Sequence, residues 1–486
     1  MRRNIAGNRV HAVFLGSESR LRLLASAQPN GPNPLYTNIF REVYFMKKKF
    51  ATRAISLTVT SALAVSLAAC GSSKEGSEGN GSGSKSPVTL TLLSHYAGAQ
   101  DEKLKPYVDM WNKDHPDIQV KLEPVDFGEL LKTIQAKQTA GQVADIMHVY
   151  SLWGGQLTKN KVLAEPPADV TDDIKKNYPD ASIKGASIAG KVYGFPTEVN
   201  AYALFYNKKM LKDAGFDNPP KTWDEMYNMA KAITKKDASG KITQQGFGFA
   251  RGYASIVDQP FMSLMATAGG QLISDDLKKA QLDSDAGKKT MDYAAKFYKD
   301  GIADVSFSVS KTFPAEQTAM TIQAGWYAGS LQGTMKDAYK NIGAAPLPSP
   351  DGSKKGSVAY TWMWGVNNKS KHQKEAWEFL KWFNTVSVKD GLTPEGSFLL
   401  DAFNSLSTRK SDLDAKPIKD KLADDAVLKT FVDALNYAIP EPNPAAGTEI
   451  QDILFKQIEA TWTGQATTDA AVQAAQKDIQ AKLAAE

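Results

Sequence analysis

The sequence predicts an α/β fold with a parallel sheet, and three observations support this prediction. Residues 88–149 alternate short apolar runs, typical of strands, with stretches whose apolar side chains recur at helical spacing. Further strand-like runs lie within residues 190–206 and at 360–366. The last 60 residues carry helical patterns. Because strands that alternate with helices usually pair in parallel, helices should cover the faces of this sheet.

Each element follows from its local pattern. We expect strands at 88–93, 118–122 and 145–149, two more within 190–206, and one at 360–366. We expect helices at 101–113, 129–139, 260–268, 286–300, 374–384 and 468–485. Thr222 and Glu225 have the spacing of a capping box, so a helix should begin there and reach Thr234.

The first 70 residues differ in composition from the rest. Six of the nine Arg lie within the first 41 residues, and the first lysine is Lys47. We therefore expect residues 1–45 to be a mis-annotated extension; the alternative is a genuine Arg-rich segment. Residues 46–69 have a basic start followed by the uncharged, mostly apolar stretch 54–69. This pattern is typical of a signal peptide and is shorter than the roughly 20 residues of a spanning helix.

The segment 67–71 (LAACG) resembles a bacterial lipobox, in which the cysteine is diacylated and becomes the first residue of the mature protein. Cys70 is the only cysteine of the chain. The alternatives are a buried small hydrophobe and a catalytic thiol. The resemblance implies a lipid anchor, such as palmitate, on Cys70 and a location on the extracellular face of the cell membrane. Residues 70–87 are rich in Gly and Ser, which predicts a flexible tether.

Processing would change the net charge. Residues 1–70 hold ten of the 58 basic residues and two of the 53 acidic ones, so the remainder carries 48 and 51, a net charge of about −3. A chain of this charge has no cationic field that would favour nucleic acid. With no second cysteine, the folded part must be stable without disulfides.

Several segments, taken in order, resemble extracellular solute-binding proteins of family 1, the carbohydrate receptors of ABC importers. The resemblance covers residues 88–483. Its blocks are ADI at 144–146 with VLAE at 162–165, GKVYGFP at 190–196 with LFYNK at 204–208, AGFDNPPKTWDE at 214–225, AM and GW at 319–326, and AWEFL at 376–380. The third block is highly specific; in the first, Ala144 replaces the usual Pro.

The resemblance implies a two-lobe periplasmic-binding-protein-like fold of type II, with discontinuous lobes joined by crossover hinge strands. Lobe 1 would comprise 88–199 plus 358–405, and lobe 2 would comprise 200–357 plus 406–486. It implies a monomeric receptor that closes around a carbohydrate, a di- or oligosaccharide, and delivers it to permease subunits served by a separate ATPase. No catalysis, cofactor, metal or nucleic-acid partner is expected.

Aromatic rings match the apolar faces of a sugar, and planar polar side chains match its hydroxyls. Five of the nine tryptophans lie within helical patterns and should pack in the core. Those at strand ends or turns are candidate platforms: Trp326, where the family places a stacking tryptophan, Trp153 and Trp362. Trp364 shares a strand face with Trp362, and either face could belong to the core.

The candidate polar contacts follow strands or precede a helix. They are Glu198, Asn200 and Tyr202 at the first lobe crossing, Tyr96 after the first strand, Asp126 after the second, and Asp258 with Gln259. The family carries an acid where this chain has Asn200, which weakens the transfer of any particular sugar specificity. Asp145 should hydrogen bond within its lobe. Arg251 and Tyr253 could line the cleft or form a surface pair.

Other functions remain open at this point. A glycosidase needs two carboxylates flanking one bond, and no ordered motif marks such a pair. The histidines show no metal or triad spacing, and a Walker A loop is absent from the sequence. A surface adhesin, a sensor, or a polyamine or phosphate receptor could use the same fold. The aromatic residues in the candidate segments favour a sugar over a polyamine or a phosphate as the ligand.

Overall fold

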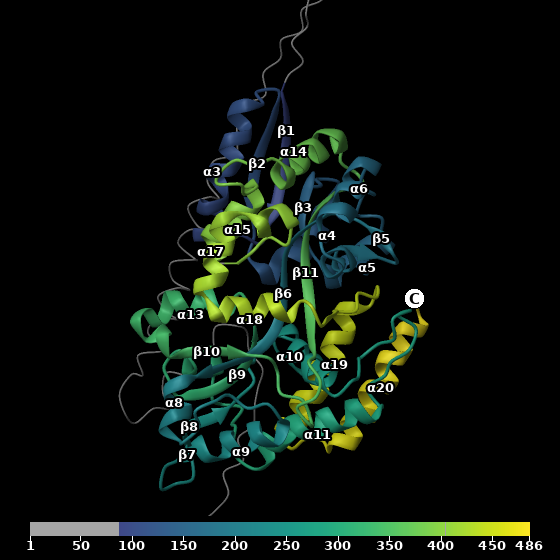
Figure 1. The fold of residues 1–486 in the computed structure, drawn as a ribbon. Helices are drawn as coiled ribbons and strands as arrows, with labels where there is room; N and C mark the ends of the chain where they lie inside the picture. Colours follow the sequence, from purple (N-terminus) through teal and green to yellow (C-terminus); the bar gives the residue numbers. More distant parts are fainter. Residues whose placement is uncertain (1–86, 404) are drawn as a thin grey trace, which may run out of the picture. The chain divides into compact units, whose positions relative to one another are not determined.

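The computed structural model describes residues 87–403 and 405–486 (Figure 1). The predictions for residues 1–45, for the signal peptide at 46–69, for Cys70 and for nearly all of the tether therefore lie outside the described residues. Within the described chain, no helix combines the length and the apolar character needed to cross a membrane.

One ten-stranded sheet organises the described residues, with a main path in the order β2-β1-β3-β11-β6-β9-β8-β7. Beside this path, β10 pairs with β6 and β12 with β11. The strands are β1 (Val88–Ser94), β2 (Ile118–Pro124), β3 (Ile146–Tyr150), β6 (Phe195–Asn207), β7 (Lys235–Lys236), β8 (Ile242–Phe247), β9 (Thr318–Ala324), β10 (Ile342–Ala345), β11 (Ser357–Val366) and β12 (Ala438–Pro440). A separate hairpin joins β4 (Ser187–Ile188) to β5 (Lys191–Val192).

The helices lie around this sheet (Figure 1). They are α3 (Ala99–Asp114), α4 (Phe127–Ala140), α5 (Gly154–Lys159), α6 (Ala168–Asn177), α7 (Asp180–Gly185), α8 (Lys208–Asp213), α9 (Trp223–Ile233), α10 (Ser255–Thr267), α11 (Asp285–Lys299), α12 (Val309–Thr312), α13 (Tyr327–Met335), α14 (Gln373–Thr385), α15 (Pro394–Phe403), α16 (Lys410–Asp414), α17 (Lys416–Asp424), α18 (Ala426–Ala434), α19 (Gly447–Trp462) and α20 (Thr468–Ala484). Two 3-10 helices, η1 (Ser151–Trp153) and η2 (Lys336–Asn341), follow β3 and α13.

The strands and helices expected from apolar spacing are present. β1 pairs in parallel with both β2 and β3, as the alternation of strands and helices predicts, but the sheet is mixed because β11 pairs antiparallel with β3 and β6. The capping box at Thr222 and Glu225 is formed and begins α9. One boundary was wrong: α10 begins at Ser255 rather than at Pro260. Its first turns bury Ile256 and Val257, and this burial stabilises a helix that continues through the proline.

Two long strands connect the halves of the sheet. Residues 195–201 of β6 pair with β11, whose far edge pairs with β3, whereas residues 202–206 of β6 pair with β9. Each half of β6 therefore belongs to a different part of the sheet, and β6 and β11 form the predicted crossover (Figure 1). We call the part around β1–β3 lobe 1 and the part around β8–β10 lobe 2.

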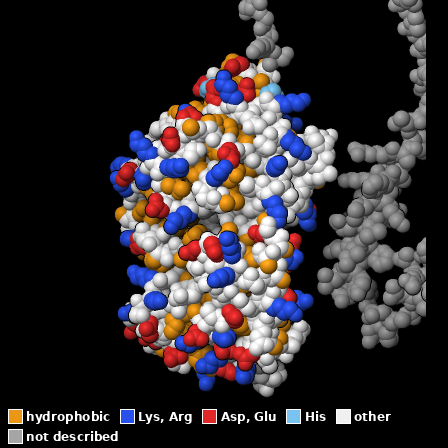
Figure 2. Space-filling model, turned by 90° about the vertical axis from the view of Figure 1, so that its right-hand side faces the viewer, with side chains coloured by type: hydrophobic (Ala, Val, Ile, Leu, Met, Phe, Trp, Pro, Cys, Tyr) orange, Lys and Arg blue, Asp and Glu red, His pale blue; other side chains and the backbone are white. Residues whose placement is uncertain are grey.

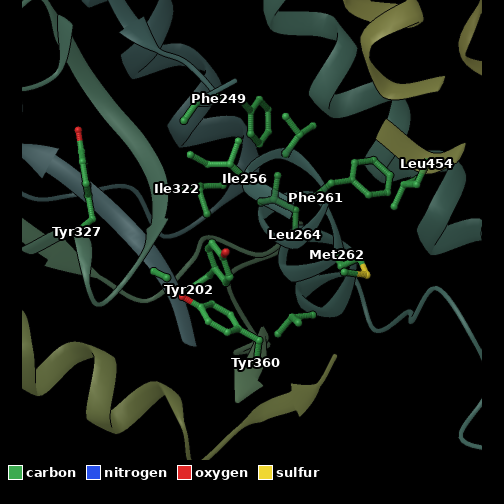
Figure 3. Close-up of a cluster of buried hydrophobic side chains, with 14 of the residues drawn as sticks. Tyr202, Phe249, Ile256, Phe261, Met262, Leu264, Ile322, Tyr327, Tyr360 and Leu454 are labelled. Carbon is green, nitrogen blue, oxygen red and sulfur yellow. The ribbon is translucent and has the colours of Figure 1, made fainter. Parts of the chain in front are cut away.

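Lobe 2 has a large apolar core around α10, which is buried along nearly its whole length. Figure 3 shows Phe261 of this helix beside Leu454 of α19, with Leu264 and Met262 on the same helix and Tyr202 and Tyr360 below them. The two tyrosine rings lie 6.2 Å apart, one from each crossover strand. The crossover is thus packed directly against the core of lobe 2.

The lobe boundaries proposed from the sequence stay a prediction. Contacts of the residues after position 405 concern the boundary that was placed there. The segment after α15 is bonded to lobe 1: Arg409 forms two hydrogen bonds, of 2.7 and 3.0 Å, with Asp173 of α6. Asp412 accepts hydrogen bonds of 2.8 Å from both the amide and the hydroxyl of Thr393. Asp145 also stays within lobe 1 as expected, because it accepts bonds from Thr91 and Ser370.

Candidate functional site

A pocket of about 770 Å³ lies where β6 and β11 cross between the lobes. Its size is within the range of small-molecule sites. Lobe 1 contributes the loop after β1, the start of α4 and the end of α15, and lobe 2 contributes α10 and α13. The lining residues are His95, Ala99, Gln100, Phe127, Tyr150, Glu198, Asn200, Tyr202, Tyr253, Ser255, Ile256, Gln259, Trp326, Gly329, Ser330, Gln332, Gly333, Tyr360, Trp362 and residues 400–403.

The floor of the pocket is built by the period-two geometry of strands. Glu198, Asn200 and Tyr202 alternate along β6, so their side chains lie on the same face of the sheet. Tyr360 and Trp362 alternate in the same way on β11, and Tyr360 is the register partner of Asn200. The crossover strands therefore place aromatic and polar side chains next to one another.

Glu198 is a buried carboxyl group whose position is fixed from behind. The hydroxyl of Tyr96 donates a 2.9 Å hydrogen bond to its Oε2 atom. Burial raises the pKa of Glu198 to about 7, and the hydrogen bond from Tyr96 opposes this shift. Glu198 can therefore accept hydrogen bonds when ionised, or donate one when protonated.

Trp362 lies under a stack of aromatic rings at the lobe 1 end of the pocket. Its ring stacks on His95 at 4.1 Å between centroids and on His148 at 4.7 Å. Burial lowers the pKa of His95 to about 3, so this imidazole is neutral at physiological pH. Trp362 therefore lines the floor of the pocket and also packs in the hydrophobic core.

Trp326 stands at the opposite wall, directly before α13. Its backbone amide donates a 3.3 Å hydrogen bond to Oδ1 of Asn200, which ties the start of α13 to the crossover strand. The side chain is half-buried, packs against the core of lobe 2 and lines the pocket. One part of the ring is therefore supported by protein while another part is available to a ligand.

A polar network lies behind the wall formed by α10. The hydroxyl of Tyr202 donates to Gln259 Oε1, and Gln259 Nε2 donates to Tyr150 and, at 2.9 Å, to Glu441. Tyr150 donates a 2.5 Å bond to Glu441, and Gln451 donates to it at 2.9 Å. Burial raises the pKa of Glu441 to about 7, and these hydrogen bonds oppose the shift.

We expect Glu441→Gln to reduce the fall in stability between about pH 5 and pH 7. A carboxyl pKa that is higher in the folded than in the unfolded chain means that the folded chain binds more protons in this range, so stability falls as the pH rises. For Glu441 this loss is at most about 3 kcal/mol, and the amide mimics the neutral acid. Urea unfolding at a series of pH values measures the change.

The exposed carboxylate Asp452, on the same helix as Gln451, provides the matched control in Asp452→Asn. Glu198 contributes a loss of the same sign and remains in both variants, so part of the slope should persist. Identical pH profiles of the wild type and Glu441→Gln would contradict the raised pKa of Glu441.

The structure brings six of the predicted site residues to the pocket: Trp326, Trp362, Glu198, Asn200, Tyr202 and Gln259. Four others are not among its lining residues. Tyr96 is fully buried behind Glu198, and Trp153 is turned into the core, where it packs edge-on against Trp362. Asp126 is exposed before α4. Asp258 is fully buried because consecutive residues of α10 point about 100° apart, so only Gln259 faces the pocket.

The pocket also contains residues that the sequence analysis did not select as site residues. Tyr150 and Tyr360 were missed because the sequence did not show which strands pair with β3 and β11. Their aromatic character and their closeness in sequence to Trp153 and Trp362 were the available signals. Phe127, 38% exposed, and Tyr253, 44% exposed, face each other across the lobes with their centroids 6.1 Å apart. The sequence left open whether Arg251 and Tyr253 line the cleft or form a surface pair. Tyr253 lines the pocket, whereas Arg251 forms an ion pair with Glu459.

Charged side chains of both signs lie on the surface of the described residues. Figure 2 shows positive and negative side chains interspersed over one face of the molecule, without a large area of one sign. Among the described residues, no group of three or more His, Cys, Asp or Glu side chains is arranged to hold a metal ion.

The crossover strands and the interlobe pocket together define a two-lobed binding protein. Solved structures share this fold. One is the GacH receptor of Streptomyces glaucescens, with a TM-score of 0.69 and 22% identity over 82% of this chain and 99% of that one. Another is the maltose-bound MalE3 of T. maritima, with a TM-score of 0.66 and 19% identity over 81% and 99%.

The chain belongs to the bacterial extracellular solute-binding proteins, whose family model matches residues 97–389. Relatives include a galactooligosaccharide-binding protein of Bacillus subtilis, 25% identical over 89% of this chain and 99% of its own length. The maltodextrin-binding protein MdxE of the same organism is 27% identical over 69% and 76%. The maltooligosaccharide ABC transporter solute-binding lipoprotein of Streptococcus pneumoniae is 26% identical over 69% of this chain and 77% of its own length.

Proposed function

We propose that this protein is an oligosaccharide receptor that serves an ABC importer and carries out no catalysis itself. The observation that carries the proposal is the composition of the pocket. Trp326, Trp362 and Tyr360 supply aromatic rings, and Glu198 and Asn200 supply planar polar groups beside them. The apolar faces of sugar rings pack on such aromatic rings, and sugar hydroxyl groups form hydrogen bonds with such polar groups. The family and the names of the relatives agree with this reading.

A volume of about 770 Å³ favours a ligand of more than one sugar unit. Because both lobes contribute walls, ligand contacts on each side would favour closure by a hinge motion of the crossover strands. The importer would then recognise the closed, liganded form. A lipid anchor on Cys70 would keep the receptor beside the permease, and the mass of the mature N-terminal peptide tests this part of the proposal.

A thermal-shift screen tests the proposed function. The panel contains maltooligosaccharides, galactooligosaccharides and arabinooligosaccharides, with a polyamine and phosphate as ligands of other classes. A bound ligand at about 100 times its dissociation constant should raise the unfolding free energy by about 2.7 kcal/mol. Chromatography of the same mixtures should recover the sugars unchanged. Stabilisation by the polyamine or phosphate alone, or the appearance of hydrolysis products, would contradict the proposal.

A further inference from the structure

A second hollow lies beside the pocket at the end of α13. Its volume is about 940 Å³, and it shares two lining residues with the pocket, Gln332 of α13 and Leu400 of α15. We call it the side groove; its other walls come from the end of β6, α8, η2, β10, α17 and the start of α18. Because the same two side chains border both spaces, the side groove adjoins the pocket at Gln332 and Leu400.

An aromatic ring forms part of the groove wall. Tyr206 is half-buried and is the penultimate residue of the crossover strand β6. Its register partner on β10 is Gly343, and a Cβ atom at this glycine would lie 2.4 Å from Cζ of Tyr206. The ring therefore crosses directly over a position where any side chain would clash. The absence of a side chain at residue 343 is what allows Tyr206 to lie here.

The remaining side chains of the groove are partly apolar and partly polar, and the polar ones carry charges of both signs. Lys208, Lys340 and Asp424 are exposed, Lys421 is half-buried, and Gln332 borders both the groove and the pocket. Asp425 is already engaged, because its carboxylate accepts a 2.9 Å hydrogen bond from the amide of Leu428. A wall with an aromatic ring, a carboxamide and charges of both signs suits a neutral, hydroxyl-rich ligand better than an anion or a cation.

We propose that the side groove is an additional subsite for a linear oligosaccharide whose first units occupy the pocket. Tyr206 is the platform for a sugar ring in this subsite, and Gln332 contacts the ligand where it leaves the pocket. This inference rests on the proposed function and adds a consequence to it: affinity increases with the length of the saccharide until the side groove is filled.

Calorimetry with maltooligosaccharides and galactooligosaccharides of two to seven units tests the inference. In the wild-type protein, longer members should bind more tightly than the disaccharide. Tyr206→Ala should lower the affinity for the long members about tenfold and leave that for the disaccharide unchanged. Tyr206→Phe, which keeps the ring, should restore the preference for long members. Should Tyr206→Ala fail to fold, Tyr339→Ala in η2 removes the other aromatic ring of the groove with the same expected outcome.

The half-buried Tyr227 of α9 lines neither space, so Tyr227→Ala is the matched control and should leave the length dependence intact. Equal affinities along the series, or a length dependence that survives removal of Tyr206 and Tyr339, would overturn the subsite while leaving the proposed function in place. Failure of every saccharide to bind would overturn both.

Discussion

Trp326→Ala is expected to weaken binding of the oligosaccharide about 30-fold, with little change in the melting temperature of the free protein. The ring is half-buried and lines the pocket, so it offers contact area to a sugar at modest cost to the core. Removing a central aromatic contact typically costs about 2 kcal/mol or more of binding free energy, which corresponds to this loss of affinity. Calorimetry with the sugar found in the screen and thermal unfolding without it give both quantities.

Trp382→Ala is the matched control, because Trp382 is another half-buried tryptophan, on α14, that does not line the pocket. It should leave the affinity unchanged. Trp326→Phe keeps an aromatic face and should recover part of the lost affinity. A large fall in melting temperature of Trp326→Ala, or unchanged affinity in a folded variant, would show that Trp326 is a core residue.

Trp362→Ala is expected to reduce the free energy of unfolding by about 3–5 kcal/mol, a typical loss for a buried tryptophan. The side chain is only 5% exposed, and removing it would leave His95, His148 and Tyr150 without the ring on which they stack. Urea denaturation compares the variant with the wild type and with Trp326→Ala. Because the chemical change is the same at both positions, any difference reports their surroundings.

Binding by Trp362→Ala should also weaken, since the same ring forms part of the pocket floor. The affinity is measured below the melting temperature of the variant, so that unfolding does not contribute. A loss of less than about 1 kcal/mol of stability would contradict the packing inferred here. The two tryptophans thus separate a contact that mainly serves the ligand from one that serves both the ligand and the fold.

Local patterns determined much of the fold. The strands at 88–94 and 118–124 and the helices between and after them follow from apolar spacing, which depends only on neighbouring residues. The capping box of α9 was recognisable for the same reason, since both of its partners lie within one turn. The extent of α10 was not recognisable, because burial in a distant core decides whether a helix continues through a proline.

The candidate site was predictable where its residues share one strand. Glu198, Asn200 and Tyr202 were selected together because the family resemblance places them at the lobe crossing, and the strand period puts them on one face. Glu441 could not be found, since no local motif brings it to Gln259, which lies 182 residues away in the chain. Asp258 and Trp153 show the opposite case, in which a suitable residue type near the site faces the core instead.

The sequence by itself determined the α/β class, the order of the elements and the family, and the family resemblance pointed to the strand that forms the pocket floor. These properties depend on side-chain periodicity and on local motifs, which are written along the chain. Only the tertiary structure decided which aromatic side chains face the pocket, that a second groove adjoins it at α13 and α15, and which carboxyl groups are buried. Those properties depend on contacts between segments far apart in the chain, whose register no local pattern specifies.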